Sequence, residues 1–443
     1  MTAEIAILNK GAVALATDSA VTISAERQAQ KIFDSADKLF ELSTAQPIGI
    51  MIYNGLQFLG MPLDAVIKEF RRSNETFPTV DEAAGKFLSH LYDLLDTAPT
   101  SEIEQNISGV IIPVINQINE EIQKKLFENL AKAEKQNPVQ HQPDLDQAFD
   151  AAAKNVLERF EKSVTRFGKA SFLPRKVEKG VRARDRSFVS ELVSEFSMQV
   201  SNEHQKRIKK ICESVLSSGY LSPSKTGLVF AGFGEKERFP SLVSFEIDGV
   251  FGGKIKFKRT ASCDIDRSGT RAYVRPFAQQ DMVDRFLYGL DDQVRSGIEK
   301  YSKNMIGKIA DGIISQLEIE NEDHRRELIE SAREAEKVFL RNLNDEAFKS
   351  IRSASRAEIE DMVEFMPKPE LAKMAEALID LTSIKRKVTR GLETVGGPVD
   401  VAVISKGEGF VWVKRKHYFP SEINARYFER MKPSSTGATG ENR

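Results

Sequence analysis

The residue types that could do chemistry begin at the second position of the chain. Thr2 directly follows Met1 and precedes an apolar run, AEIAILN, so its hydroxyl lies at the start of a predicted strand. A threonine hydroxyl is a weak nucleophile until a base removes its proton, and a free α-amine titrates near neutral pH, where it can serve as that base. Removal of Met1 would place both groups on one residue. The alternative interpretation is that Thr2 is an ordinary residue in the initiator context.

A hairpin and several further strands are predicted to hold this residue in place. Two apolar runs flank the turn Asn9-Lys10-Gly11, a pattern that is typical of a β-hairpin because glycine accepts a positive φ. A short buried strand is expected in GIMIYNG, which ends at Gly55. Three more apolar runs between residues 226 and 260, and two between residues 398 and 415, complete the predicted strands.

Helical periodicity dominates the remaining sequence, from Met61 to about residue 220 and from Asp281 to Thr389. Strands at both ends and in the middle, separated by helices, favour an α+β fold. The chain is interpreted as one domain over residues 1–443. Its expected core comprises approximately 2–96, 221–294 and 366–416, its helical insertions approximately 97–220 and 295–365, and its disordered tail 432–443.

The composition argues against several classes of protein. Lys and Arg number 64 against 65 Asp and Glu, a formal net charge of -1, so no overall field attracts nucleic acid or a membrane. The basic run at 162–186 is interpreted as a solvated loop. No apolar stretch reaches the ~20 residues of a membrane span, and no signal peptide is recognised, so a cytoplasmic protein is expected. Two cysteines, five scattered histidines and no glycine-rich phosphate loop predict neither a metal site nor a cofactor.

Four stretches, in order along the chain, resemble proteasome β-type subunits. They are TAEIAILNKGAVALATDSAVT, DKLFELSTAQPIGIMIYNG, GLVFAGFGEKERFPSLVSFEIDG and VGGPVDVAVISKGEGFVWV. The resemblance implies the N-terminal-nucleophile hydrolase fold, a four-layer αββα sandwich in which two stacked antiparallel sheets lie between helix layers. In this chain the sandwich would carry long helical insertions.

The resemblance also implies a role for four positions. Thr2 matches the family nucleophile, whose own α-amine acts as the base once the preceding residue is removed. Asp18 stands sixteen positions later, like the family's acidic residue. Lys38 begins a Lys-x-Phe strand, like the family's lysine, with Lys31 as the competing candidate. Gly55, at the end of the following strand, matches the residue whose backbone N–H binds the oxyanion.

The sequence departs from the family in the groups that orient the α-amine. The stretch PFAQQD, residues 276–281, occupies the place of a Ser-Gly-Ser sequence, and Val395 stands where a serine is expected. Gln279 and Thr394 are the candidates for the missing polar contacts. These departures leave open whether the site is active.

The implied function is a threonine peptidase that cleaves peptide bonds in unfolded protein. The resemblance further implies a ring or helical homo-oligomer and a separate ATPase unfoldase as partners. Two alternatives share the same fold. One is a catalytically inactive proteasome-like scaffold whose insertions bind a partner, and the other is an N-terminal-nucleophile amidase that acts on small substrates.

Overall fold

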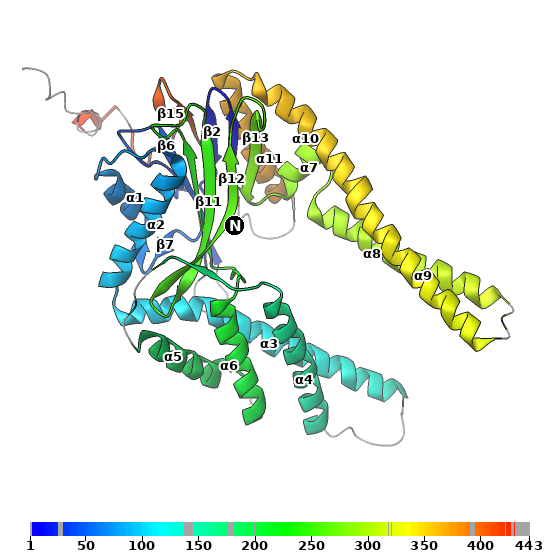
Figure 1. Ribbon diagram of the computed structural model, residues 1–443. Helices are drawn as coiled ribbons and strands as arrows, with labels where there is room; N and C mark the ends of the chain where they lie inside the picture. Colours follow the sequence, from blue (N-terminus) through cyan, green and yellow to red (C-terminus); the bar gives the residue numbers. More distant parts are fainter. Residues whose placement is uncertain are drawn as a thin grey trace, which may run out of the picture.

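The computed structural model describes residues 2–24, 30–136, 145–174, 177, 180–198, 200–317, 319, 321–389, 395–420, 422–426 and 429. Thr394 and the predicted tail at 432–443 lie outside the described residues. The described part of the chain combines helices with antiparallel sheets (Figure 1), which confirms the predicted α+β class. No helix in this part is long and apolar enough to cross a membrane.

Two large sheets form the centre of the structure. The first has the strand order β13 (Ala272–Ala278), β1 (Ala3–Asn9), β2 (Val13–Thr17), β14 (Asp400–Ser405) and β15 (Gly409–Lys414). The second has the order β5 (Leu39–Glu41), β6 (Ile48–Asn54), β10 (Thr226–Gly232), β11 (Ser241–Phe251), β12 (Lys254–Asp264) and β9 (Ser171–Phe172). Two small hairpins accompany them, β3 (Val21–Ser24) with β4 (Gln30–Phe33) and β7 (Gln57–Phe58) with β8 (Met61–Pro62).

The predicted N-terminal hairpin is confirmed as β1 and β2. Its turn is closed by Asn9, whose backbone N–H donates to the carbonyl of Ala12 at 3.0 Å. The Asn9 side-chain oxygen accepts from the backbone N–H groups of Gly11 and Ala12 at 2.9 and 3.1 Å. The side chain thus satisfies turn donors that the strands leave unpaired, which fixes the register of the strand that carries Thr2.

Strand β1 is buried on both faces, because it lies between two apolar layers. Ile5 and Ile7 face a cluster that includes Leu371 of the helix layer, whereas Ala6 and Leu8 face the second sheet. This alternation follows from the period of two along a strand. Thr2 and Glu4 continue the row of Ala6 and Leu8, so the first residues of the chain reach the space between the sheets.

Helices cover the outer faces of both sheets (Figure 1). On the second sheet, α1 (Leu63–Arg71) and α2 (Val80–Thr97) pack through Val66 and Phe87 onto Ile50 and Phe230. The side chain of Thr79 accepts from the Glu82 N–H at 3.1 Å and caps α2. On the first sheet, α7 (Asp281–Tyr288) and α11 (Lys368–Val388) pack over β1, β2 and β14.

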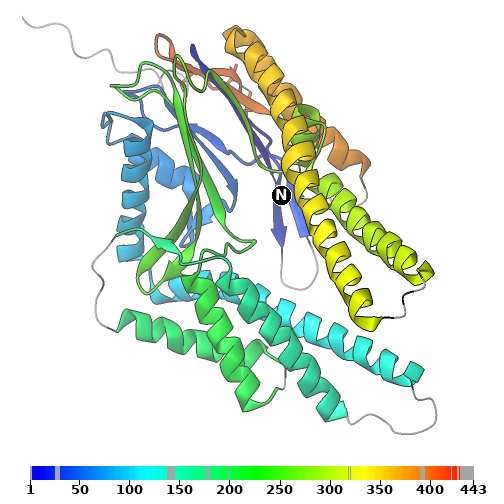
Figure 2. The same ribbon diagram turned by 45° about the vertical axis from the view of Figure 1, so that its right-hand side comes forward.

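Two helical assemblies extend from this centre. Helices α3 (Thr100–Gln136), α4 (Leu145–Thr165), α5 (Val181–Phe196) and α6 (Asn202–Ser217) share an apolar cluster of their own, which also includes Phe251 of β11. Helices α8 (Asp292–Gln316), α9 (Glu322–Asn342) and α10 (Lys349–Glu364), with a π-helical turn, η1 (Leu343–Phe348), between the last two, form a long arm (Figures 1 and 2). The first assembly lies within the range 97–220 predicted as an insertion, whereas the second begins at Asp292, just before the predicted range 295–365.

Candidate active site

Thr2 lies in the space between the sheets and is 2 % exposed. Its backbone carbonyl accepts a hydrogen bond of 3.1 Å from the N–H of Gln279, directly after β13. Its Oγ1 donates to Oε2 of Glu4 at 3.3 Å and lies 3.5 Å from the backbone nitrogen of Asn54. The hydroxyl therefore meets an acid on its own strand and a backbone donor from the second sheet.

Asp18 and Lys38 form an ion pair of 2.6 Å, and neither side chain is exposed. The same Asp18 oxygen accepts from the N–H of Ala3 at 3.1 Å, so the pair is joined to the residue that follows Thr2. Lys38 also donates to the carbonyl of Ala20 at 2.6 Å. Lys31, the competing candidate, lies on β4 of a separate hairpin. The structure thus brings Lys38 to Asp18 through contacts on β1 and on the chain just after β2.

The glycine segment before β14 completes the surroundings of Asp18. The N–H of Gly396 donates to Asp18 Oδ2 at 3.1 Å, and the carbonyl of Gly396 accepts from the N–H of Ser19 at 3.1 Å. The Ser19 hydroxyl donates to the carbonyl of Pro398 at 2.5 Å. With the N–H of Ala20 at 3.3 Å, the Asp18 carboxylate accepts from three backbone amides as well as from Lys38. This satisfies a buried carboxylate and fixes its orientation.

The backbone donor nearest the Thr2 hydroxyl belongs to Asn54 rather than to Gly55. Asn54 ends β6 with a φ of 62°, a left-handed conformation that asparagine tolerates better than most residues. Gly55 has a different role here, because a Cβ at this position would lie 2.1 Å from Thr226 Oγ1. The glycine permits close packing against β10, while the preceding residue presents its N–H to Thr2.

The positions that depart from the family behave differently from one another. Gln279 contacts Thr2 through its backbone, and its side-chain oxygen accepts from Arg386 of α11. Ala278, directly before it, has a φ of 58°, which is uncommon for a residue with a side chain. Val395 is fully buried in the apolar cluster under α11 and supplies no polar group. Gln279 is therefore brought to Thr2, whereas Val395 belongs to the core.

Glu4 is the site residue that the sequence reasoning missed. It is 1 % exposed, it accepts the hydrogen bond from Thr2, and its Oε1 has no partner among the described residues. Burial raises the pKa of the Glu4 carboxyl well above its usual value; the Lys38 ammonium lowers this pKa and the Asp18 carboxylate raises it. Its signal was visible, because Glu4 is the single charged residue in a strand whose two faces are both apolar.

The raised pKa makes the stability of the protein depend on pH. An acid whose pKa is higher when folded contributes stability that is present below its unfolded pKa and is lost as the pH rises through the folded pKa. We expect Glu4→Gln to remove this loss, so that the stability of the variant rises relative to that of the wild type once the pH exceeds the usual pKa of a glutamate. The gain amounts to about 1.4 kcal/mol for each pH unit between the two pKa values.

Denaturant unfolding of both proteins across pH 4 to 9 measures this difference. Glu161→Gln is the control with the opposite sign, because hydrogen bonds from Arg207 lower the pKa of the Glu161 carboxyl. We expect that variant to lose stability relative to the wild type as the pH rises. A Glu4→Gln difference that stays constant over the whole range would contradict a carboxyl held protonated by burial.

Among the described residues, no group of three or more His, Cys, Asp or Glu side chains is placed to bind a metal ion.

Comparison with protein-family models and with curated proteins gives no match for this chain. The likeness to proteasome β-type subunits therefore rests on the quoted residues, and the chemistry has to be argued from the geometry described above.

Proposed function

We propose that the chain is an N-terminal threonine hydrolase that cleaves peptide or other amide bonds after removal of Met1. The observation that carries the proposal is the fully buried Lys38–Asp18 pair, which is bonded to the residue next to Thr2. Burying two charges costs several kcal/mol for each ion, and well-packed apolar residues often stabilise a fold as well or better. A buried charge cluster beside a hydroxyl is more typical of a functional site.

The arrangement of layers supports the same proposal. We infer that the two sheets and their helices form the αββα sandwich of N-terminal-nucleophile hydrolases. Apolar residues of both sheets share one cluster, which includes Leu15 of β2 and Met51 of β6. Helices α1 and α2 pack on one outer face, and α7 and α11 pack on the other. In this fold the first strand delivers its first residue to the space between the sheets, where Thr2 lies.

In the proposed reaction, the free α-amine of Thr2 takes the hydroxyl proton while Oγ1 attacks the carbonyl carbon of the amide. The Lys38 ammonium, oriented by Asp18, stabilises the developing negative charge and favours the neutral amine. The N–H of Asn54 would donate to the oxyanion, and one such donor is worth about 3 kcal/mol. The proton then passes to the leaving nitrogen as the carbon–nitrogen bond breaks. Water, activated by the same amine, hydrolyses the resulting ester.

Glu4 is a second candidate for the base, because it accepts the hydrogen bond from the Thr2 hydroxyl. We assign the base to the α-amine instead. Burial raises the pKa of Glu4 and so favours the protonated carboxyl, which has no free capacity to take a proton from Thr2. In this assignment Glu4 orients the hydroxyl and leaves the proton transfer to the amine.

One observation favours the inactive scaffold as the second candidate. Thr2 is only 2 % exposed, and Val395 adds apolar surface where the family has a hydroxyl. A substrate carbonyl could reach Oγ1 only if the groups that cover Thr2 move once Met1 is removed. Access to the hydroxyl is therefore the property that separates the enzyme from the scaffold.

Intact mass and labelling test this access directly. We expect protein purified from its native host to lack Met1 and to react once with an electrophile selective for an N-terminal threonine. Peptide mapping should place the adduct on Thr2. Unfolded protein is the control, and it should label more slowly because the Lys38–Asp18 pair no longer assists. Retention of Met1, or a processed protein that does not react with the electrophile, would favour the scaffold.

A further inference from the structure

A cavity of about 660 Å³ lies where the helical arm meets the first sheet, away from Thr2. Its walls come from β13, from the helices α7 and α8, and from the π-helical turn η1 with the start of α10. Two acidic side chains line it, against five basic ones: Arg275, Arg295, Lys349, Arg352 and Arg356. The volume is that of a site for a small molecule, and the charge is that of a site for an anion.

Two arginines of the cavity, Arg275 and Arg295, are incompletely paired, whereas Arg356 donates to Glu360 at 2.7 Å. The side chain of Arg275 makes no hydrogen bond with a described residue and its buried Nε has no partner, although its charge attracts the nearby Asp284 carboxylate. The Nε of Arg295 is likewise buried without a partner, and its terminal nitrogens lie 3.4 and 3.9 Å from the nearest carboxylates. A buried charged donor without an acceptor costs more than a neutral one, so native structures keep few of them. An anion in the cavity would supply the missing acceptors.

Two further basic groups are held in place but keep donors available. Arg352 lies over the ring of Tyr288 at 5.3 Å, and its ion pairs to Asp284 and Asp292 are long, at 3.7 and 3.8 Å. Lys349 is exposed and has no ion pair among the described residues. Aromatic stacking orients a guanidinium without using its N–H groups. The cavity therefore combines the oriented guanidinium of Arg352 with the exposed ammonium of Lys349.

The turn that forms one wall is unusual. η1 is a π-helical segment between α9 and α10, and such segments are rare and often lie at functional sites. It places Asn344 at the cavity, where the side-chain oxygen is buried and has no partner among the described residues. Asn344 thus offers an acceptor for a hydroxyl of a ligand, next to the donors of the arginines.

We propose that this cavity binds a small molecule that carries a pyrophosphate group. Guanidinium forks match phosphate oxygens in pairs, and several basic groups around one cavity suit a ligand with more than two negative charges. The site does not depend on the hydrolase proposal. It is connected to the candidate active site, because Arg275 lies opposite Ala6 in the pairing of β13 with β1, the strand that follows Thr2.

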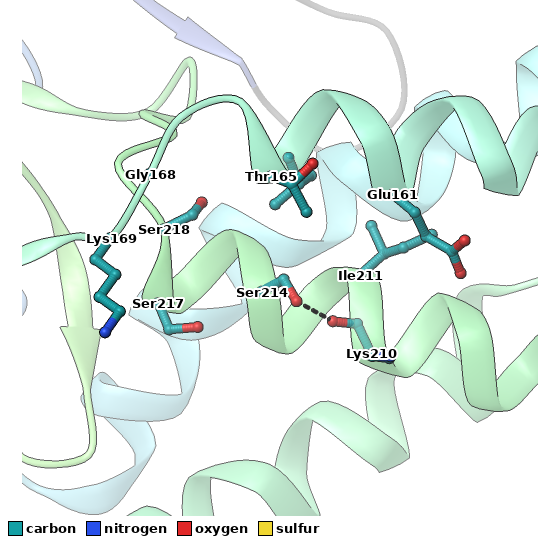
Figure 3. Close-up of a pocket in the computed structure, with 10 residues that line it drawn as sticks. Glu161, Thr165, Gly168, Lys169, Lys210, Ile211, Ser214, Ser217 and Ser218 are labelled. Atoms are coloured by element: carbon teal, nitrogen blue, oxygen red, sulfur yellow. Dashed lines mark hydrogen bonds between the residues drawn. The ribbon is translucent and has the colours of Figure 1, made fainter.

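A second cavity serves as a contrast, because its hydroxyl side chains already have hydrogen-bond partners within the protein. It measures about 370 Å³ and lies between α4 and α6 (Figure 3). Its serine hydroxyls are used within their own helix, since Ser214 donates to the carbonyl of Lys210 and Ser217 donates to that of Glu213, both at 2.7 Å. Its Glu161 accepts from Nε and Nη2 of Arg207, at 3.0 and 2.9 Å. Among the described residues that line this cavity, no buried side-chain donor lacks a partner, and we assign the cavity no ligand.

Calorimetric titration of the full chain with sodium pyrophosphate tests the proposal. We expect saturable binding at low ionic strength, weakened by added salt. Arg275→Gln should weaken it by a factor of about 10 to 100, the range of one hydrogen bond to a charged group. Because Arg275 donates no side-chain hydrogen bond to a described residue, this variant should stay folded, and its melting temperature is measured beside its affinity. Arg326→Gln, an exposed arginine of α9, is the matched control and should bind like the wild type.

Two further arms make the result decisive. Lys349→Gln, at an exposed position, should also weaken binding, and it carries the test if Arg275→Gln does not fold. Citrate supplies a similar charge on carboxylates, and we expect it to bind at least about tenfold more weakly than pyrophosphate because the spacing of its oxygens differs. The proposal is overturned if pyrophosphate does not bind at about 1 mM, if both variants bind like the wild type, or if citrate binds equally well.

Discussion

Replacing Thr2 by alanine is expected to abolish amide hydrolysis, with a loss of about 10⁴-fold or more, while the protein stays folded. The variant removes Oγ1 and the Cγ2 methyl; Oγ1 makes only a 3.3 Å bond to Glu4 and a 3.5 Å contact to Asn54, so little stability is lost. Thr2→Ser keeps a hydroxyl and an α-amine at the same place and should retain measurable turnover. Release of a fluorophore from peptide amides, normalised to folded protein, measures both variants.

Thr17 provides a matched control on the neighbouring strand. It is a fully buried threonine that lies opposite Glu4 in the pairing of β1 with β2, and its hydroxyl has no partner among the described residues. Thr17→Ala therefore removes the same atoms a few ångströms away without removing the nucleophile, and we expect activity near that of the wild type. Equal turnover by Thr2→Ala and the wild type would exclude Thr2 as the nucleophile.

The part of this site that follows from local pattern could be predicted from the sequence. The hairpin of β1 and β2 has a period of two and an Asn-Lys-Gly turn, and these fix where Thr2 begins its strand. Asp18 and Lys38 were instead assigned through the resemblance to proteasome β-type subunits, and the structure brings them within 2.6 Å. Local rules succeed for the hairpin because the turn and the strand alternation set its geometry.

Two features of the site depend on contacts that the local pattern does not contain. Asn54 rather than Gly55 faces Thr2, because the positive φ of Asn54 turns the end of β6 and the side-chain hydroxyl of Thr226 lies where Gly55 must have no Cβ. Glu4 was read as one residue of an apolar strand, although a carboxyl buried on both sides needs an explanation. Its neighbours come from β6 and from Lys38, which only the packing of the sheets reveals.

The arginine cavity could not be predicted from the sequence for a related reason. Its residues come from a strand at 275, a helix at 295, and η1 with the start of α10 at 344–356, and no short motif links them. Each of these arginines alone is compatible with a solvated surface residue. Only the packing of the arm against β13 shows that the Nε of Arg275 is buried without a hydrogen-bond partner among the described residues.

Replacing Lys38 by methionine is expected to lower turnover by a factor of about 10² to 10³ and to destabilise the fold. Methionine fills a similar volume but leaves Asp18 as a buried carboxylate without its counter-ion. Removing one partner of a buried pair costs about 3–5 kcal/mol. Stability and activity would therefore fall together, and the kinetic loss must be separated from the loss of folded protein.

Lys256 allows that separation. It is 2 % exposed and pairs with Asp248 at 3.3 Å on the second sheet, beside α6 and outside the site of Thr2. We expect Lys256→Met to destabilise the protein by a similar amount, measured by denaturant unfolding, but to keep wild-type turnover per folded molecule. If both variants lose the same fraction of turnover, Lys38 acts through stability alone. Both lysines are buried and each is paired with a buried aspartate, but only the Lys38–Asp18 pair lies beside Thr2. A loss of turnover in Lys38→Met alone would therefore show that the charge of Lys38 is needed at the Thr2 hydroxyl.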